Sequence, residues 1–364
     1  MTQAIKFVGL DVHVRQTTMA VLDKDTGEIS RCKLRMEPAK VIEHLVGIDG
    51  EVRAVYEAGP TGLELARLGA ERGVDVRVCA PGLIPRAPSD RVKTDARDAE
   101  RLARQLAAGS LTFVRIPSPA EESLRDLVRA REDIRADLMR ARHRLSKFLL
   151  RYGRRYSDGH GRNWSKLHMH WLAQQSFDDA ATEVAFTDYV GAVRNLTDRR
   201  DRLEAKLEAL LPASPFAATA ARLRCFRGID TLSAAGLCAE VGPFERFEHP
   251  ARLSSFLGVV PGEWTTDTKR RQGSITKTGS GHARRLLVEA AWHYRRSPRV
   301  GLTLERRQRE APAAAIDVAW RCQHRLFDRW QRLRVQRGKP AGLVAIACAR
   351  ELSTFCWEAA VADA

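Results

Sequence analysis

Apolar and polar residues alternate through much of the first hundred positions, a pattern typical of strands that bury one face. Residues 5–22 form one long apolar run that predicts a strand, and 29–36 predict the strand that returns after the polar turn at 23–27. Further elements are expected in this order: a helix near 39–48, a strand over 52–57, a helix near 63–73, a strand over 74–79 and a helix over 95–107. The order predicts an α/β unit, a mixed sheet with flanking helices.

After residue 120 the spacing of apolar residues lengthens to three and four positions, as in long helices. Two such stripes are present: Leu127, Ile134, Leu138, Ala141, Leu145 and Phe148, then Tyr189, Val193, Leu196, Leu203, Leu207 and Leu210. With an irregular stretch between them, the stripes predict an antiparallel coiled-coil arm. A simple helical linker or a dimerisation surface would account for the same pattern.

The last part of the chain is predicted to be mainly helical. Phe226–Asp230, then Thr231–Val241 with Gly242-Pro243-Phe244, is typical of a helix-hairpin-helix element, whose glycine-containing turn would offer backbone N–H groups to a phosphate. The segment from Pro261 to Gly281 is rich in hydroxyls and glycines and is interpreted as a loop. We therefore expect three domains, which span 1–115, 116–215 and 216–364.

The chain carries a large excess of positive charge, +16 at pH 7 with a pI of about 10.0. Such an excess favours a polyanionic partner, either nucleic acid or an anionic membrane surface. Because the sequence has neither a run of about eighteen apolar residues nor a signal-peptide pattern, we expect a cytoplasmic protein that binds nucleic acid and no membrane.

Positive charge is densest over 269–296, which holds eight Lys or Arg residues and one acid, Glu289. A solvated surface would also carry such residues, but the local imbalance favours contact with phosphates. The residues expected to bind nucleic acid are Lys93, Lys269, Arg270, Arg271, Lys277, Arg284 and Arg285.

Four acids have contexts that could bring them together. Asp95 and Asp98 lie three residues apart at the start of a predicted helix, while Asp11 and Glu57 lie in predicted strands. Converging carboxylates bind Mg²⁺, or Mn²⁺ as the alternative, and in a basic protein the natural substrate for these ions is a phosphodiester. Simpler roles exist for each acid taken alone: a turn residue for Asp11, a cap of the Gly-Pro turn for Glu57, and a helix N-cap for Asp95 with Asp98 three residues on.

Five motifs, taken in order, give the chain a family resemblance. They are Gly9-Leu10-Asp11, Glu57-Ala58-Gly59-Pro60-Thr61-Gly62, Lys93-Thr94-Asp95-Ala96-Arg97-Asp98-Ala99, Leu257-Gly258-Val259-Val260-Pro261 and Gly273-Ser274-Ile275-Thr276-Lys277-Thr278-Gly279. Together they resemble the DEDD transposases of the insertion-sequence one-ten group, which include the Piv-type DNA invertases. The resemblance covers nearly the whole chain. It implies a RuvC-like, ribonuclease-H-type N-terminal domain, a coiled coil and a C-terminal transposase domain.

The resemblance also implies an activity. Asp11, Glu57, Asp95 and Asp98 would hold magnesium, and a serine of the C-terminal loop would attack DNA to form a covalent phosphoserine link. The substrates would be donor and target DNA, and the guide would be a structured RNA from the same element. The assembly would be a homo-oligomer, either a dimer or a tetramer.

One motif departs from the family pattern. A Ser-Ser-Gly triplet is usual after the Leu-Gly-x-x-Pro motif, whereas this chain has Thr265, Thr266 and Asp267. Threonine can act as a nucleophile, but its β-branch crowds the attacking oxygen, and Asp267 would repel a phosphate. Ser274 is the substitute candidate. The departure leaves two alternatives to a recombinase: a metal-dependent nuclease or junction resolvase, and a non-catalytic relic that still binds nucleic acid.

Overall fold

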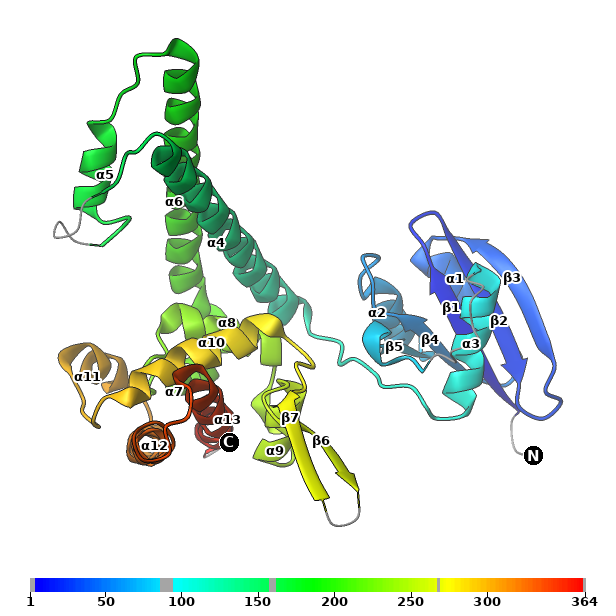
Figure 1. The fold of residues 1–364 in the computed structure, drawn as a ribbon. Coiled ribbons are helices and arrows are strands. Elements are labelled where there is room, and N and C mark those ends of the chain that lie inside the picture. The colour runs from blue at the N-terminus through cyan, green and yellow to red at the C-terminus, as the bar shows by residue number, and fades with distance from the viewer. Residues whose placement is uncertain (1–3, 86–93, 157–161, 267–268, 363–364) are drawn as a thin grey trace. The chain divides into compact units, whose positions relative to one another are not determined.

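The computed structural model describes residues 4–85, 94–156, 162–266 and 269–362, with the backbone alone at 265, 266, 269 and 270. The chain divides into two compact units, Met1–Pro117 and Ser118–Ala364, and each is described by itself. The predicted α/β plus α organisation is confirmed, because strands and helices share the first unit and helices dominate the second (Figure 1). The finer three-domain division stays a prediction.

The first unit is built on a five-stranded mixed sheet. Its elements are β1 (Ile5–Val12), β2 (Gln16–Asp23), β3 (Ile29–Arg35), α1 (Pro38–Val46), β4 (Glu51–Glu57), α2 (Glu64–Glu71), β5 (Asp75–Cys79), the 3₁₀ turn η1 (Pro81–Leu83) and α3 (Asp95–Ala107). The strand order is β3-β2-β1-β4-β5. Antiparallel pairing joins the first three strands, and parallel pairing joins β1 to β4 and β4 to β5.

The prediction of one strand over 5–22 was wrong, because the chain reverses at His13–Arg15 to form β1 and β2. The reversal is closed by the N–H of His13, which donates to the carbonyl of Gln16 at 3.0 Å. Neither glycine nor proline marks this turn, and Val14 within it is apolar but exposed. The turn therefore leaves the apolar pattern almost unbroken.

The two faces of the sheet are covered by different helices. Val8 and Tyr56 belong to a core that α1 and α2 complete, whereas Phe7 and Val55 pack with Leu102 of α3 on the opposite face. The glycine at position 9 faces α3, and a Cβ atom built on it would lie 1.9 Å from the carbonyl oxygen of Ala99. Backbone therefore meets backbone where α3 crosses β1.

The second unit begins with two long helices. They are α4 (Pro119–Arg151) and α6 (Ala180–Leu210), with the short α5 (Lys166–Ala173) between them. The two long helices pair antiparallel, since Leu124 and Val128 near the start of α4 share a core with Leu207, while Phe148 shares one with Phe186. Leu210 departs from the predicted apolar seam, because it is 54% exposed.

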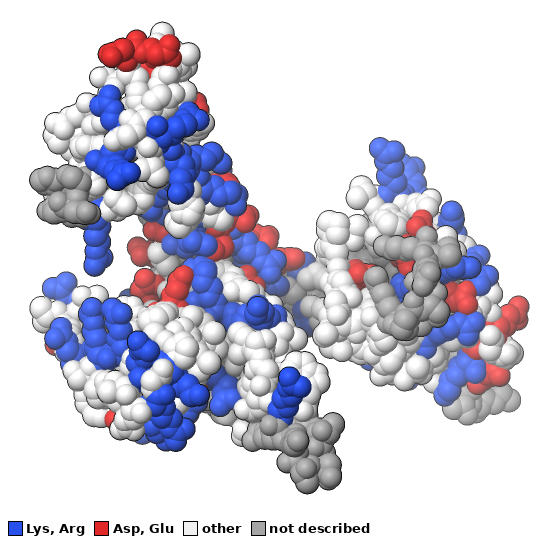
Figure 2. Space-filling model, viewed as in Figure 1, with Lys and Arg blue, Asp and Glu red and all other residues white. Residues whose placement is uncertain are grey.

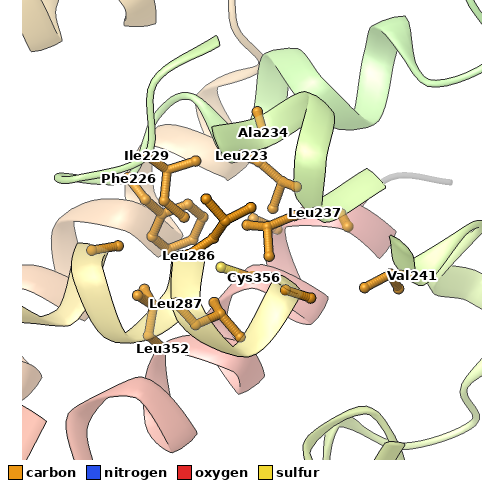
Figure 3. Close-up of a cluster of buried hydrophobic side chains, with 14 of the residues drawn as sticks. Leu223, Phe226, Ile229, Ala234, Leu237, Val241, Leu286, Leu287, Leu352 and Cys356 are labelled. Atoms are coloured by element: carbon orange, nitrogen blue, oxygen red, sulfur yellow. The ribbon is translucent and has the colours of Figure 1, made fainter. Parts of the chain in front are cut away.

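The base of these helices is buried in a larger helical core. The remaining elements are η2 (Leu211–Ala213), α7 (Ala217–Leu223), α8 (Thr231–Val241), η3 (Phe244–Arg246), α9 (Pro250–Phe256), β6 (Pro261–Thr266), β7 (Lys269–Ile275), α10 (Gly281–Ala291), η4 (Trp292–Arg295), α11 (Leu302–Gln308), α12 (Ala313–Trp330), the π-helical η5 (Gln331–Gln336) and α13 (Ala341–Val361). Side chains of α8, α10 and α13 meet around Phe226, with Leu237, Leu286 and Leu352 among them (Figure 3). Across the described residues, no helix combines the length and apolarity needed to cross a bilayer.

The segment interpreted as a loop is in fact largely a two-stranded hairpin. β6 and β7 pair antiparallel from Pro261 with Ile275 to Thr266 with Lys269. The aromatic ring of Trp264 lies over two glycines, because a Cβ atom added to Gly273 would approach it to 2.5 Å and one added to Gly262 to 3.4 Å. The tryptophan supplies the side-chain cover that glycines lack in a sheet, which explains why a glycine-containing segment is a strand here.

We predict that Gly9→Ala destabilises the first unit by about 3 kcal/mol, the upper end of what overpacking costs, because the new methyl group would push α3 off the sheet. Hydrogen–deuterium exchange of β1 and α3 in the full-length chain would measure the loss of protection. Gly47→Ala is the matched control, because its added Cβ would make ordinary contacts beyond 3.4 Å at a negative φ of −76°. Equal protection in both variants would contradict the prediction.

Candidate functional site

Strand register brings Asp11 and Glu57 to neighbouring places at the same edge of the sheet. β1 and β4 are parallel and Leu10 pairs with Tyr56, so the following residues, Asp11 and Glu57, come next in register. Leu10 and Tyr56 point into the core under α1 and α2. Because side chains alternate along a strand, the two acids point to the other face, the one that α3 covers.

Helix α3 begins at this edge and adds two further acids. Its N-cap is Thr94, whose side-chain oxygen accepts a hydrogen bond from the N–H of Arg97. The simpler role considered for Asp95, that of the N-cap, was therefore wrong: Asp95 is the first residue of the helix. Asp98, one turn later, is buried and forms an ion pair with Arg101.

A histidine completes a compact cluster with two of these acids. His13 Nε2 lies 3.3 Å from Asp11 Oδ2 and 3.7 Å from Asp95 Oδ1. One ligand atom from each of the three residues lies within 4.8 Å of the others, a spacing that suits a metal ion. The sequence interpretation missed His13, although a histidine two residues beyond a strand acid is a signal that could have included it.

The environment of Asp11 favours a cation. Burial raises the pKa of its carboxyl group, the nearby His13 works in the opposite direction, and the negative charges of Asp95 and Asp98 raise it further. Thr18, paired with Asp11 across β1 and β2, is 2% exposed, and its hydroxyl has no hydrogen-bond partner among the described residues. Clustered acids and an unsatisfied oxygen are what a bound divalent ion would stabilise.

Glu57 lies beside the cluster rather than within it. Its carboxylate is exposed and belongs to none of the metal-compatible groups found among the described residues. It does act on its neighbour on β5, because burial and then the charge of Glu57 raise the pKa of the Cys79 thiol to about 11.

The predicted hydroxyl nucleophiles are at the end of the hairpin in the second unit. Thr265 and Thr266 are the last residues of β6 and pair with Arg270 and Lys269, although the side chains of all four lie outside the described residues. Asp267 and Lys93 also lie outside them. The structure therefore places the two threonines by backbone alone.

Ser274, the substitute nucleophile candidate, is exposed, and so are the basic candidates Arg271 and Lys277. Arg271 and Lys277 have solvent-accessible side chains, and Lys277 adopts a left-handed backbone with φ of 58°. Ser274 and Lys277 line a cavity of about 630 Å³, whose opposite side includes Arg350 of α13. The Ser274 hydroxyl thus shares one opening with three cations, Lys277, Arg329 and Arg350.

Arg284 and Arg285 are engaged within the fold. Arg284 donates to the carbonyls of Leu257 and Thr278, at 2.9 and 2.6 Å, and so ties the segment after β7 to α9 and α10. Arg285 donates to Glu289 at 2.9 Å and to Glu132 of α4 at 2.8 Å. Both residues therefore hold elements of the second unit together.

A cluster of charged residues links the base of α4 to the C-terminal helices. His282 of α10 lies 3.6 Å from Glu132 of α4 and 3.7 Å from Glu240 of α8. Burial works to raise the pKa of Glu240, but the neighbouring His282 and Arg129 side chains outweigh it and hold that pKa at about 2. Three helices therefore meet at one charged contact.

Comparison with known proteins decides the family. Residues 8–153 match the profile of the DEDD transposases of IS110, and 220–303 match that of the IS116/IS110/IS902 transposase family. The transposase candidate y4qE of Sinorhizobium fredii is 38% identical over 356 residues, 96% of this chain and 87% of that protein. The transposase of insertion sequence element IS1533 from Leptospira borgpetersenii is 30% identical over 92% of this chain and 98% of its own.

The chain belongs to the IS110 family of insertion-sequence transposases. An IS110 transposase cuts and joins DNA, so DNA is its substrate. The acidic cluster around Asp11 falls within the first matched region of this IS110 chain, and the hairpin with its hydroxyls falls within the second. The two candidate sites are therefore in the parts that define the family.

We predict that Asp11→Asn stabilises the first unit at pH 7 in the presence of chelator. The folded state raises the pKa of this carboxyl above its ordinary 3.8, so the folded state binds the proton more tightly and the ionised form opposes folding at neutral pH. The advantage of the variant should shrink as pH falls through the raised pKa and vanish below 3.8. Urea unfolding across pH 3 to 7, a range of about four units, measures it.

Asp25→Asn, on the exposed turn between β2 and β3, is the control for loss of one negative charge. A gap between Asp11→Asn and the unmodified chain that does not change with pH would contradict the assignment of the effect to the Asp11 carboxyl.

Proposed function

We propose that this IS110 transposase moves DNA by metal-dependent phosphoryl transfer with a protein hydroxyl as nucleophile, guided by a structured RNA from its own element. The observation that carries the proposal is the cluster of Asp11, His13 and Asp95 at the sheet edge, with Asp98 one turn along α3. A sheet of order β3-β2-β1-β4-β5 supports a RuvC-like, ribonuclease-H-type domain.

Asp11 and Asp95 would hold the divalent ion, with Asp98 and Glu57 as further oxygen donors. Carboxylate oxygens suit Mg²⁺, and the imidazole of His13 makes Mn²⁺ a close second. A bound ion would act as a Lewis acid toward a phosphodiester oxygen. Asp98 is also held by Arg101, so this ion pair fixes the carboxylate on the face of α3 that meets the sheet.

A hydroxyl of the hairpin would form the covalent link to DNA. The oxygen of Thr265 or Thr266, or of Ser274, attacks phosphorus, the bond to the leaving deoxyribose oxygen breaks, and that oxygen takes up the proton. Thr265 and Thr266 stand where the family has its serines. Ser274 has the support of a described environment, the cavity that it shares with Lys277 and Arg350.

The remaining features fit handling of nucleic acid by an oligomer. A net charge of +16 suits simultaneous contact with DNA and a guide RNA. The α4–α6 pair would act as a coiled-coil arm between subunits of a dimer or tetramer, and α7, its following turn and α8 as a helix-hairpin-helix element.

We predict that Mg²⁺ stabilises the chain and that the double variant Asp11→Asn, Asp95→Asn loses this effect. At a concentration about 100 times the dissociation constant, an ion bound to the folded state alone adds about 2.7 kcal/mol. Urea unfolding with and without Mg²⁺ measures the difference. Asp23→Asn and Asp25→Asn together remove the same charge from the β2–β3 turn and should leave the effect intact. Equal stabilisation of both double variants would exclude these acids as ligands.

A trapping assay tests the nucleophile. The chain is mixed with the RNA that flanks its element, labelled donor and target DNA and Mg²⁺, and run on a denaturing gel. We expect a protein–DNA adduct that disappears in chelator, in Asp11→Asn, and in the double variant Thr265→Ala, Thr266→Ala. Thr276→Ala, a hydroxyl outside the proposed set but next to β7, is the matched control and should retain the adduct.

Other outcomes separate the alternatives. An adduct that survives both threonine changes but not Ser274→Ala would move the nucleophile to Ser274. Cleaved DNA without an adduct would overturn the covalent mechanism in favour of a metal-dependent nuclease. Bound but intact DNA would identify a non-catalytic relic.

A further inference from the structure

A basic cavity of about 480 Å³ lies in the second unit, away from the hairpin hydroxyls along the chain. It opens between the turn that joins α7 to α8 and the segment that leads from η4 into α11. Its lining residues are Arg227, Gly228, Asp230, His293, Arg299 and the residues Gly301, Leu302, Thr303, Leu304 and Arg307. Three arginines and a histidine thus face one acid among the residues that line it.

The walls of this cavity are held by two of its own arginines. Arg227 Nη1 donates to the carbonyls of Arg296 at 3.0 Å and Ser297 at 2.9 Å, and Arg307 donates to the carbonyl of Ile229. Arg307 Nε is buried without a hydrogen-bond partner among the described residues. The site is therefore built into the fold and retains an unsatisfied donor.

The turn itself fits tightly beneath the cavity. Gly228 has φ of +85°, and a Cβ atom added to it would lie 2.8 Å from the carbonyl oxygen of Ala290 and 3.0 Å from the ring of His293. A side chain at this position would displace α10 or His293. Glycine thus lets the cationic side chains on both walls come close together.

The acid among the lining residues, Asp230, already has a structural role. Asp230 caps α8, accepting the N–H of Ser233 at 2.8 Å. Burial lowers the pKa of His293, and the charges of Arg227, Arg296, Arg295 and Arg307 lower it further. From His293 through Arg309 the chain has six arginines and one acid, Glu305. Figure 2 shows blue side chains gathered over α11 and α12 with little red among them.

We propose that this cavity binds a backbone phosphate of nucleic acid, as an anchoring contact separate from the β6–β7 hairpin. Guanidinium groups are suited to phosphate oxygens, to which they donate paired hydrogen bonds, and a negative charge would relieve the repulsion among the arginines. A backbone phosphate fits because a transposase acts on a polyanion and because phosphate and sugar oxygens accept the larger share of protein–DNA hydrogen bonds. DNA and the guide RNA share this chemistry. The inference rests on family membership and not on the proposed metal or nucleophile.

Arg299→Glu is the decisive variant. The backbone N–H of Arg299 donates to Gln323 at 3.2 Å, so its side chain can change without loss of that bond or of those that hold the walls. Fluorescence anisotropy in chelator, with duplex DNA in one arm and the element-flanking RNA in the other, measures binding without chemistry. For whichever nucleic acid the cavity binds, DNA or RNA, we expect the affinity of the variant to fall about tenfold. The slope of log affinity against log salt concentration should become shallower by about one. Arg299→Gln should show a smaller loss in the same arm.

Arg72→Glu, exposed on the first unit, makes the same change of charge and is the matched control. Circular dichroism of Arg299→Glu and Arg299→Gln checks that both fold. A loss in one arm alone identifies DNA or RNA as the source of the phosphate. Affinity and salt slope equal to those of Arg72→Glu in both arms would overturn the proposal, whatever the trapping assay shows. Loss of the adduct in Asp11→Asn with unchanged anisotropy would leave it standing.

Discussion

Helix α3 can lie on the central strand of the first unit because position 9 has no side chain. The carbonyl oxygen of Ala99 in α3 occupies the place where a Cβ atom of residue 9 would be, and α3 therefore lies close to β1. That closeness brings the first turn of α3, with Asp95 and Asp98, to the edge where β1 delivers Asp11. The acidic cluster is thus a result of packing between backbone atoms, and its electrostatic strain is offset by the apolar contacts of α3 with Phe7 and Val55.

Much of the first unit could be predicted from the sequence, because its strands and helices follow the periods of two and about 3.6 residues. Asp95 and Asp98 lie in the first turn of α3, where the pattern predicted a helix to start, and Asp11 lies in β1, although that strand ends at Val12 and not at residue 22. The β1–β2 reversal could not be predicted from the sequence, because its residues carry no turn signal. The position of His13, which lies in that reversal, could therefore not be predicted either. The place of Glu57 in register was predictable, but the exposure of its side chain, which belongs to none of the metal-compatible groups among the described residues, was not.

In the second unit, local periodicity predicted the long helices but not their limits. Leu210 continues the apolar stripe in sequence, yet it lies where α6 gives way to η2, and there the stripe no longer faces α4. The hairpin was hidden for a different reason. Its glycines and hydroxyls are typical of loops, and the cover that the Trp264 ring gives to Gly273 is a contact across strands that no local pattern shows. Pairings between distant residues, such as Arg227 with the carbonyls after η4, lie beyond any local pattern.

The charged contact at His282 has a mechanical consequence. Glu132 on α4 and Glu240 on α8 flank His282 in the first turn of α10, and two residues further Arg284 donates to the carbonyl of Thr278, in the segment that follows the β6–β7 hairpin. The base of the α4–α6 pair therefore contacts α10, the same helix that holds the segment after the hydroxyl-bearing strands β6 and β7. Because the same helix α10 contacts both α4 and the segment after β7, a displacement of the long helices would be expected to move the strands that carry the hydroxyl candidates.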